Sequence, residues 1–410
     1  MQNLSKPRLH IPVPAARPGD TPDFSRLEIP EAGSVRRPDT ASDPAEMRDL
    51  AYDLIRVLDF DHRAVGPWDP RLDPETLRRA LRLMVLDRAF EERMHQAQRQ
   101  GKTSFFMRGL GEEAIGIAHA MALSDEDMCF TSYRQQGLLI ARGCPLIDMM
   151  NQVYNNAADK LHGLQVPLHY SFPEFGYFAM SGNLATQVPQ AVGWAMAAAY
   201  SGDDRIAATF LGDGATAEGD FYTGLLFASV YRAPVIISVS NNQWAISCFA
   251  GIAGGERTTF AARGVGVGLP SLRVDGNDFL AVYAAVQWAA ERARSNHGAT
   301  LIEFVTYRAH GHSTSDDPTR YRPADEFAAW PLGDPLQRLK GHLVALDEWS
   351  EERHQAYEQE AKDEVRALQR EAEAIGTLHT GTKPSARAMF DHVFEESDWR
   401  HRRQRQEMGI

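Results

Sequence analysis

The sequence lacks the features that mark membrane, nucleic-acid-binding and disulfide-rich proteins. Its longest apolar run, AVGWAMAAAY at 191–200, is shorter than the ~20 residues needed to span a bilayer. The net charge of −12 argues against nucleic acid or an anionic membrane as a partner. The cysteines, Cys129, Cys144 and Cys248, are too few and too scattered for a disulfide framework or a zinc knuckle. We therefore expect a protein of the cytoplasm rather than of the mitochondrial matrix.

The N-terminal residues 1–45 also lack the features of a targeting peptide. They contain no apolar segment of the signal type and carry six acidic residues, whereas transit peptides are poor in acids. Their eight prolines predict an extended arm with no core of its own. Such an arm either hangs free or wraps a neighbouring subunit, and the composition does not choose between these alternatives.

Residues 46–340 alternate short β-rich runs with helical stretches. Strands are predicted at 205–211, 233–240, 271–276 and 299–307, and helices at 75–102, 217–232 and 277–296. Continuously apolar strands that alternate with helices predict an α/β fold, with a parallel sheet covered by helices on both faces. Ligands of such sheets bind at the carboxyl ends of the strands. Residues 341–410 are expected to add a C-terminal helical segment, including a charged surface helix at 347–374.

Two polar motifs that follow neighbouring strands carry the strongest chemical signal. GDG at 212–214 directly follows one predicted strand, and NN at 241–242 directly follows the next. Residues 215–240 suffice for a turn, a helix and a strand, so the two strands can be adjacent and parallel. Asp213 and Asn242 would then lie side by side at one sheet edge. A carboxylate and an amide oxygen so placed suit Mg²⁺ shared with phosphate oxygens, and the glycines let the backbone approach a phosphate.

Two simpler interpretations compete with this metal and phosphate site. A lone GDG is most often a tight turn, but a second polar motif at matching spacing makes a turn alone a poor explanation. A nicotinamide-binding loop is the other competitor, because GDGATAEG begins with G-x-G. Its acid lies inside the loop, where Asp213 would repel a diphosphate unless a metal ion lay between them.

A second polar cluster, RAHGHSTSDD at 308–317, follows the last predicted strand. It holds two histidines, three hydroxyl side chains and two aspartates, a composition that fits a metal site, an acid–base pair or a solvated loop. Two histidines so close on a loop are no zinc site without further ligands. Asp316 and Asp317 are expected to order the loop by pairing with an arginine at 320 or 322.

These motifs and their surroundings resemble a known family. GDG followed by NN is similar to the thiamine diphosphate motif. The segments at 104–123, 131–137, 183–197, 272–283 and 307–322 look like the alpha subunit of the decarboxylating component of 2-oxo acid dehydrogenases. The GEEA element and the HSTSDD loop are closer to branched-chain than to pyruvate-type alpha subunits. The resemblance extends from about residue 50 to beyond 340 and implies a thiamine-diphosphate-binding fold for residues 46–340.

The resemblance also assigns roles to individual residues. It makes the Asp213 carboxylate, the Asn242 side chain and the main-chain carbonyl of Trp244 the ligands of Mg²⁺. Arg134 would hold the diphosphate, for which a guanidinium is suited because it binds phosphate at two points. The other cofactor-binding positions that it implies are Tyr133, Gly182, Leu184, Gly212, Gly214, Ala215, Arg308 and His312.

Residues near the reacting atoms follow from the same resemblance. His312 is the implied catalytic histidine, with Ser313 beside it in the substrate channel. Leu184 would be the apolar wedge under the bent cofactor, and Gly182 would meet its aminopyrimidine ring. Phe105 matches a wall of the substrate pocket.

The chain departs from the family pattern at three places. Ser240 stands where related chains carry an arginine, so one diphosphate contact is missing or comes from elsewhere. Asn183 replaces a proline in the stretch 181–187 that holds a monovalent cation in some relatives, so a K⁺ site is left open. The order His310-Gly311-His312 replaces two adjacent histidines, which makes His310 a structural residue in this interpretation.

The chain carries only the half of the family's site that binds metal and diphosphate. In the family, the glutamate that hydrogen-bonds the aminopyrimidine sits on a second domain of similar fold, and 410 residues leave no room for that domain. We therefore expect an obligate beta subunit in a heterotetramer of two alpha and two beta chains. A lipoyl-bearing acyltransferase core is the other implied macromolecular partner.

The implied reaction is oxidative decarboxylation of branched-chain 2-oxo acids, such as 3-methyl-2-oxobutanoate. The acyl group would pass to the lipoyl group of the acyltransferase core. Two other enzymes remain as alternatives: a pyruvate dehydrogenase alpha subunit and a subunit of a nonoxidative, transketolase-like enzyme. A binding module that has lost catalysis is a further alternative.

Overall fold

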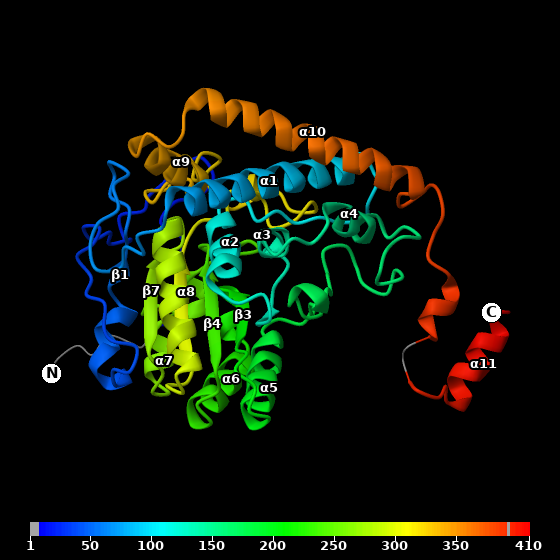
Figure 1. Ribbon diagram of the computed structural model, residues 1–410, viewed down its shortest axis with the longest axis horizontal. Helices are drawn as coiled ribbons and strands as arrows, with labels where there is room; N and C mark the ends of the chain where they lie inside the picture. Colours follow the sequence, from blue (N-terminus) through cyan, green and yellow to red (C-terminus); the bar gives the residue numbers. More distant parts are fainter. Residues whose placement is uncertain (1–7, 392–393) are drawn as a thin grey trace.

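Six strands form one parallel sheet in the computed structural model, which describes residues 8–391 and 394–410 (Figure 1). The spatial order of the strands is β1-β7-β8-β4-β3-β2. Their bounds are Leu54–Ile55 (β1), Met128–Phe130 (β2), Ala207–Gly212 (β3), Val235–Asn241 (β4), Ser271–Asp275 (β7) and Thr300–Val305 (β8). The central strands β4 and β8 are buried along their whole length, which explains why they carry apolar side chains on both faces of the sheet. The predicted parallel α/β sheet is confirmed.

Helices cover both faces of this sheet and separate two cores. On one face lie α1 (Pro74–Arg99), α2 (Glu113–Ala122) and α8 (Phe279–Arg294), and on the other lie α5 (Gln187–Tyr200) and α6 (Gly219–Val230). Successive strand residues point to opposite faces, so Phe210 belongs to the first core and Leu211 to the second. The remaining helices are α3 (Gln136–Ala141), α4 (Leu146–Tyr154), α7 (Ala262–Val265), α9 (Pro335–Ala345), α10 (Glu351–Ile375) and α11 (Trp399–Glu407). In the described part of the chain, no helix has the length and apolarity to cross a membrane.

Short polar side chains set where the long helices begin. Asp73 accepts hydrogen bonds from the Glu75 and Thr76 amides at the start of α1, and Pro74 is the first helical residue. At the start of α8, the Asp278 carboxylate accepts from two backbone amides in the same way. The predicted charged helix at 347–374 is present as α10, and it buries one stripe of side chains against α1.

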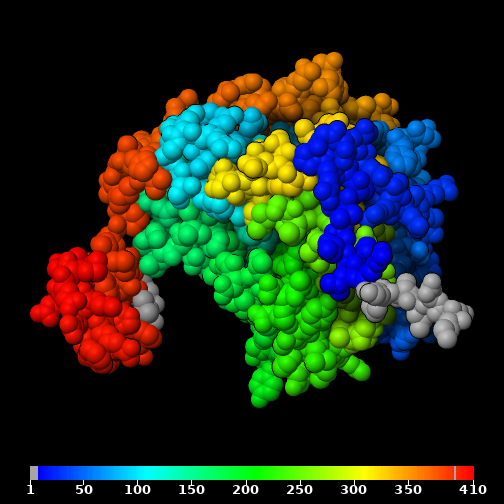
Figure 2. Space-filling model, turned by 180° about the vertical axis from the view of Figure 1, so that it is seen from behind, coloured from blue at the N-terminus to red at the C-terminus, as the bar shows by residue number. Residues whose placement is uncertain are grey.

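The N-terminal arm lies on the surface of its own chain, where Figure 2 shows it in blue. The Phe24 ring packs edge-on against Tyr307 and Trp330, with centroid distances of 5.9 and 5.1 Å. Farther along, the Trp288 indole donates to the Pro38 carbonyl at 3.0 Å. At Phe24 and Pro38 the arm thus packs on its own chain, a course that neither expected alternative described, and its contact with a neighbouring subunit stays a prediction.

The last part of the chain, with α11, stands apart from the sheet domain. Figures 1 and 2 show α11 and the turn before it projecting beyond the end of α10. By contrast, α9 and α10 pack along α1. The expected division at residues 45 and 340 remains a prediction. Helices α9 and α10 share the core of the preceding domain.

Candidate active site

The two motifs predicted to share a sheet edge do lie side by side. Strands β3 and β4 are parallel neighbours, with Gly212 opposite Ser240 in register. Asp213 and Asn242 therefore leave the sheet at the same edge, and the Asp213 amide donates to the Ser240 carbonyl at 3.2 Å. The Ser240 hydroxyl itself is buried without a hydrogen-bond partner. Ser240 therefore makes no polar side-chain contact at the position where related chains carry an arginine, and what supplies the missing diphosphate contact stays open.

The glycines of the GDG motif serve two different purposes. A Cβ placed on Gly212 would meet no atom within 4 Å, so open space lies beside this backbone. A Cβ on Gly214 would lie 2.3 Å from the Ala245 side chain, in the small hairpin of β5 (Trp244–Ala245) and β6 (Cys248–Phe249). Ala215 follows in a short 3-10 turn and is buried. The first glycine leaves room for a ligand, and the second allows the hairpin to pack against the motif.

Asp213 is a buried carboxylate with one oxygen that has no partner. One oxygen accepts from the Gly214 amide at 2.8 Å, while Oδ2 is buried with no hydrogen-bond partner. Burial raises the pKa of Asp213 to about 7, and the nearby carboxylate of Glu112 adds to the rise. A bound cation would remove the unfavourable burial of Oδ2. Within the described residues, no group of three or more His, Cys, Asp or Glu side chains is placed to hold a metal, so the site depends on amide and main-chain oxygens as well.

Glu112 orients Asn242, a role that the sequence pattern did not predict. Asn242 Nδ2 donates to Glu112 Oε1 at 2.7 Å, which turns the amide oxygen of Asn242 away from Glu112. That oxygen accepts only a long contact from the Trp244 amide, at 3.3 Å. Asp213 Oδ2 and Asn242 Oδ1 are therefore hard oxygen donors that fit Mg²⁺. The GEEA element marked the family, and its position at a buried helix start was the signal that could have pointed to Glu112.

Arg308 contacts the carbonyl that was expected to bind the cation. Its Nη1 donates to the Trp244 carbonyl at 2.9 Å, and Nη2 donates to the Ile246 carbonyl at 2.8 Å. Burial lowers the pKa of Arg308 to about 10. Because a carbonyl oxygen has two lone pairs, the Trp244 carbonyl can accept this hydrogen bond and still coordinate a cation. The structure gives Arg308 a loop-anchoring contact, and its contact with a cofactor stays a prediction.

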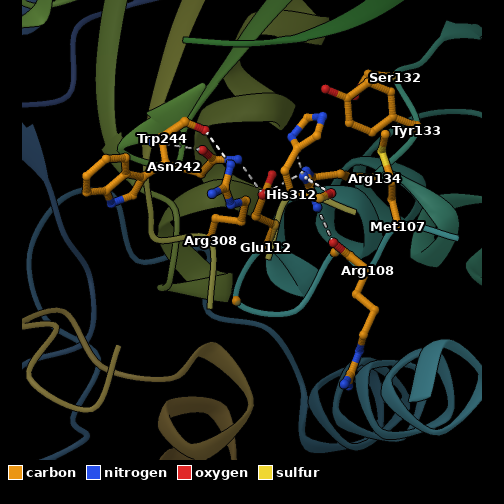
Figure 3. A network of polar contacts seen from close by, with 12 residues as sticks. Met107, Arg108, Glu112, Ser132, Tyr133, Arg134, Asn242, Trp244, Arg308 and His312 are labelled. Carbon is orange, nitrogen blue, oxygen red and sulfur yellow. Dashed lines mark hydrogen bonds and ion pairs between the residues drawn. The ribbon is translucent and has the colours of Figure 1, made fainter. Parts of the chain in front are cut away.

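Arg134 and His312 form the other side of the site (Figure 3). Arg134 Nη2 donates to His312 Nδ1 at 3.2 Å and to the His312 carbonyl at 2.9 Å. Burial, together with the charges of Arg134 and Arg308, lowers the pKa of His312 to about 3. The ring is therefore neutral near pH 7, and because Nδ1 accepts, its proton is assigned to Nε2. Tyr133 packs edge-on against this imidazole at 5.7 Å, and burial raises the pKa of its phenol.

The loop that carries His312 is held by a different network from the one expected. Asp316 Oδ2 accepts from the His312 amide and from the Tyr321 hydroxyl, each at 2.6 Å. Arg322 donates to the Arg308 carbonyl at 2.7 Å rather than to an aspartate. Asp317 caps the short turn that follows it. The predicted pairing of these acids with an arginine at 320 or 322 is therefore wrong in its partner, although the loop is ordered by an acid as expected.

Phe105 and Ser313 lie on two chain segments that are hydrogen-bonded to each other. The Thr314 amide donates to the Phe106 carbonyl at 3.0 Å, and the Phe106 amide donates to the Thr314 hydroxyl at 3.2 Å. Phe105 is partly buried against the first core, and Ser313 is buried with its hydroxyl accepting from Ser315. The structure thus brings Phe105 and Ser313 to adjoining chain segments beside His312.

Gly182 and Leu184 lie in a more open part of the chain. Leu184 is 52% exposed, although the resemblance places it under a cofactor. A Cβ on Gly182 would come within 3.1 Å of the His169 ring, so a larger residue would crowd that histidine. At the end of this stretch, Gln187 donates to the Phe210 carbonyl in β3 at 2.7 Å. Only the end of the 181–187 segment is thus tied to the strand that carries the GDG motif.

Comparisons with known proteins agree with this geometry. The family model described as "Dehydrogenase E1 component" matches residues 81–380, so the chain belongs to the dehydrogenase E1 component family. A second model, "2-oxoisovalerate dehydrogenase E1 alpha subunit N terminal", matches residues 5–45. The chain is 59% identical over 410 residues to 2-oxoisovalerate dehydrogenase subunit alpha of Pseudomonas aeruginosa, with both chains covered completely.

More distant relatives carry the same name. The chain is 38% identical over 374 residues to 2-oxoisovalerate dehydrogenase subunit alpha 1, mitochondrial, of Arabidopsis thaliana, covering 90% of this chain and 74% of the relative. It is 36% identical over 363 residues to the mitochondrial subunit alpha of Bos taurus, covering 87% and 77%. The predicted resemblance to branched-chain alpha subunits is confirmed.

Proposed function

We propose that this chain is the catalytic alpha subunit of a branched-chain 2-oxo acid dehydrogenase. With a beta subunit, it carries out oxidative decarboxylation of 3-methyl-2-oxobutanoate and related acids and passes the acyl group to a lipoyl-bearing acyltransferase core. The observation that carries the proposal is the sheet edge where Asp213 Oδ2 is buried without a partner beside Asn242. This edge occurs in a chain that is similar over its full length to a 2-oxoisovalerate dehydrogenase alpha subunit.

The residues at this edge fit thiamine diphosphate and Mg²⁺. Asp213, Asn242 and the Trp244 carbonyl would hold the cation, and Arg134 lies where a guanidinium could exchange its contacts for diphosphate oxygens. The open space beside Gly212 leaves room for a diphosphate at the end of β3. When bound, thiamine diphosphate supplies the electron sink that decarboxylation requires.

His312 is the group of this chain best placed to handle a proton. Its neutral ring can donate from Nε2, while Arg134 fixes the ring through Nδ1. The hydrogen bond from the His312 amide to Asp316 holds the loop so that the ring stays in this position. Phe105 and Ser313 would form the adjoining substrate wall, with Phe105 excluding water from it.

A K⁺ ion in the segment 181–187 is a further part of the proposal. The Gln187 amide oxygen is buried and has no hydrogen-bond partner, while its nitrogen is held by Phe210. An oxygen left in this state is suited to a weakly held monovalent cation. Cofactor affinity should therefore be higher in KCl than in tetramethylammonium chloride of equal ionic strength. Equal affinity in the two salts would exclude the K⁺ site.

An exposed apolar face on the second helix layer supports a partner chain. On α6, Leu226, Phe227 and Val230 are about half exposed or more, and Tyr200 at the end of α5 is almost fully exposed. Leu184 is exposed as well. Exposed apolar side chains gathered in this way mark an interaction surface, and the beta subunit is the partner that the function requires. We place the assembly, two alpha and two beta chains, in the cytoplasm.

The decisive experiment is to co-express the chain with its beta subunit and assay the purified assembly. With Mg²⁺, thiamine diphosphate and a lipoyl domain, 3-methyl-2-oxobutanoate should be the preferred substrate over pyruvate. Preference for pyruvate would establish the pyruvate-type alternative. Activity on sugar phosphates without any response to the lipoyl domain would establish the transketolase-like alternative. Full decarboxylation by this chain alone would contradict the need for a beta subunit.

A further inference from the structure

A cationic cavity lies at the end of the sheet opposite the candidate active site. It has a volume of about 480 Å³ and opens between a 3-10 helix, η1 (Pro44–Ala51), and the C-terminal ends of α6 and α8. Pro270 and Ala299, which precede β7 and β8, form its floor, so the cavity is at the amino ends of these strands. Its size lies within the usual range of small-molecule sites, about 300 to 1,000 Å³.

The charge of this cavity is opposite to that of the chain. Arg48, Arg232, Arg292 and His297 line it, and Asp43 is the one acidic residue of its lining within the described structure. The Asp43 carboxylate is already engaged in capping η1, where it accepts from the Ala45 amide at 2.8 Å. A cluster of guanidinium groups in a protein of net charge −12 is therefore not a consequence of overall composition.

Arg292 is the buried member of the cluster and has no carboxylate partner among the described ion pairs. The residue is 3% exposed, and its Nε is buried with no hydrogen-bond partner. Its Nη1 donates to the Ser42 carbonyl at 3.0 Å and also contacts the Thr40 carbonyl. Neutral carbonyls orient a guanidinium but do not neutralise it, and burial lowers the pKa of Arg292 although the charge of Asp43 acts in the opposite direction. An anion in the cavity would supply the missing charge.

Arg232 is presented to the cavity by an unusual backbone. It follows the C-cap of α6 with φ of 49°, in the left-handed region that helix ends commonly fill with glycine or asparagine. Gly298 packs against this backbone so closely that a Cβ on it would lie 3.3 Å from the Arg232 Cα. A long cationic side chain thus occupies a position where a smaller residue would be easier to accommodate.

We propose that this cavity binds a small multivalent oxyanion, a metabolite that carries phosphate or several carboxylates. Arg292 forms the buried anchor, and Arg232 and Arg48 close on the anion from the rim. The guanidinium fork suits both phosphate and carboxylate oxygens, so the shared chemistry is the multivalent oxyanion itself. The proposal concerns a site separate from the GDG and NN motifs and does not depend on the proposed decarboxylation.

The test is calorimetric titration of the assembled alpha–beta protein, saturated with thiamine diphosphate and Mg²⁺ so that the active-site diphosphate position is filled. Inorganic phosphate and tricarballylate are titrated separately, which distinguishes a phosphate ligand from a polycarboxylate. Arg232→Asn keeps a residue that tolerates the left-handed backbone and should weaken binding at least about tenfold. Arg366→Gln, an exposed arginine on α10, is the matched control and should bind like the wild type.

Arg292→Met should abolish binding, because it keeps the apolar stem beside Trp288 and removes the charge. Its melting temperature must be measured, since the variant also loses two contacts with the arm. If it does not fold, Arg232→Asn decides the question alone. The proposal is overturned if neither anion binds to the assembled wild type. It is also overturned if Arg232→Asn binds the anion as tightly as the control Arg366→Gln and the wild type do.

Discussion

The sheet edge that carries Asp213 and Asn242 and the segment at 181–187 are two parts of one predicted cofactor site, and they differ in how far this chain buries them. At the edge, Asp213, Asn242 and Glu112 are all buried, and Glu112 holds Asn242 by a hydrogen bond. In the segment, the Leu184 side chain is 52% exposed. We expect a surface of another chain to cover the exposed part of this site. The edge should therefore respond to mutation in the isolated chain, and the segment mainly in the assembly.

The largest effect is expected from Asp213→Asn at the buried edge. The assembled variant should bind thiamine diphosphate more than about 100-fold more weakly in Mg²⁺, because the anionic metal ligand is lost. Without ligands, the same variant should melt at the same temperature or higher, since an unpaired buried carboxylate is removed. Calorimetry and thermal melting test both directions. Asp203→Asn, at a partly exposed aspartate paired with Arg205, is the control and should bind as the wild type does.

Glu112 should contribute less to cofactor binding than Asp213 does, and it should act by orienting Asn242. Glu112→Ala releases the Asn242 amide and should weaken binding of thiamine diphosphate with Mg²⁺ by about 10- to 100-fold. Glu112→Gln still offers an oxygen to Asn242 Nδ2 and should lose much less affinity. Equal losses in the two variants would show that the charge of Glu112, rather than its hydrogen bond, matters at the site.

A buried histidine of α2, His119, should make the free energy of unfolding of this chain depend on pH. This histidine lies between α2 and β4, bonded to the Ile115 carbonyl and the Ser238 hydroxyl, and burial lowers its pKa to about 3. Between the ordinary pKa of about 6.5 and pH 3, the unfolded chain therefore binds a proton that the folded chain does not, so stability falls as the pH falls through this window.

At pH 5, the contribution of His119 is a loss of about 2 kcal/mol in the free energy of unfolding. His119→Gln should therefore lose about 2 kcal/mol less than the wild type between pH 7 and pH 5 in urea titrations of the chain. The comparison is between the two pH dependences, because other buried carboxylates titrate in both proteins. Parallel curves would mean that the folded chain does not lower the pKa of His119.

The difference between the two halves also explains which features the sequence could predict. Asp213 and Asn242 were predicted to be neighbours because one helix and one strand separate two motifs at strand ends. The parallel register of β3 and β4 then brings the two motifs to the same sheet edge. Glu112 reaches Asn242 from 130 positions away, and Arg308 reaches Trp244 from 64 positions away. Contacts of this kind depend on how helices and loops pack over the sheet, and no local pattern encodes them.

The arm and the His312 loop illustrate the same limit. Proline content predicted an extended arm, but its course depends on Phe24 packing against both Tyr307 and Trp330, which no spacing rule reveals. An acid was expected to order the His312 loop, yet its actual partner is a backbone amide and a tyrosine. The residue types were predictable from the chemistry required, and the partners were not.

The smallest effect in the isolated chain is expected from Leu184→Ser. Because the side chain is half exposed, the free energy of unfolding of this chain alone should change by no more than about 0.5 kcal/mol. In the assembly, the same change should weaken cofactor binding, since a polar residue replaces the apolar wedge. Leu164→Ser, at an exposed leucine of similar accessibility, provides the matched control. A loss above about 1 kcal/mol in the isolated chain would show that Leu184 packs within its own chain, and the contrast between the two halves would then be wrong.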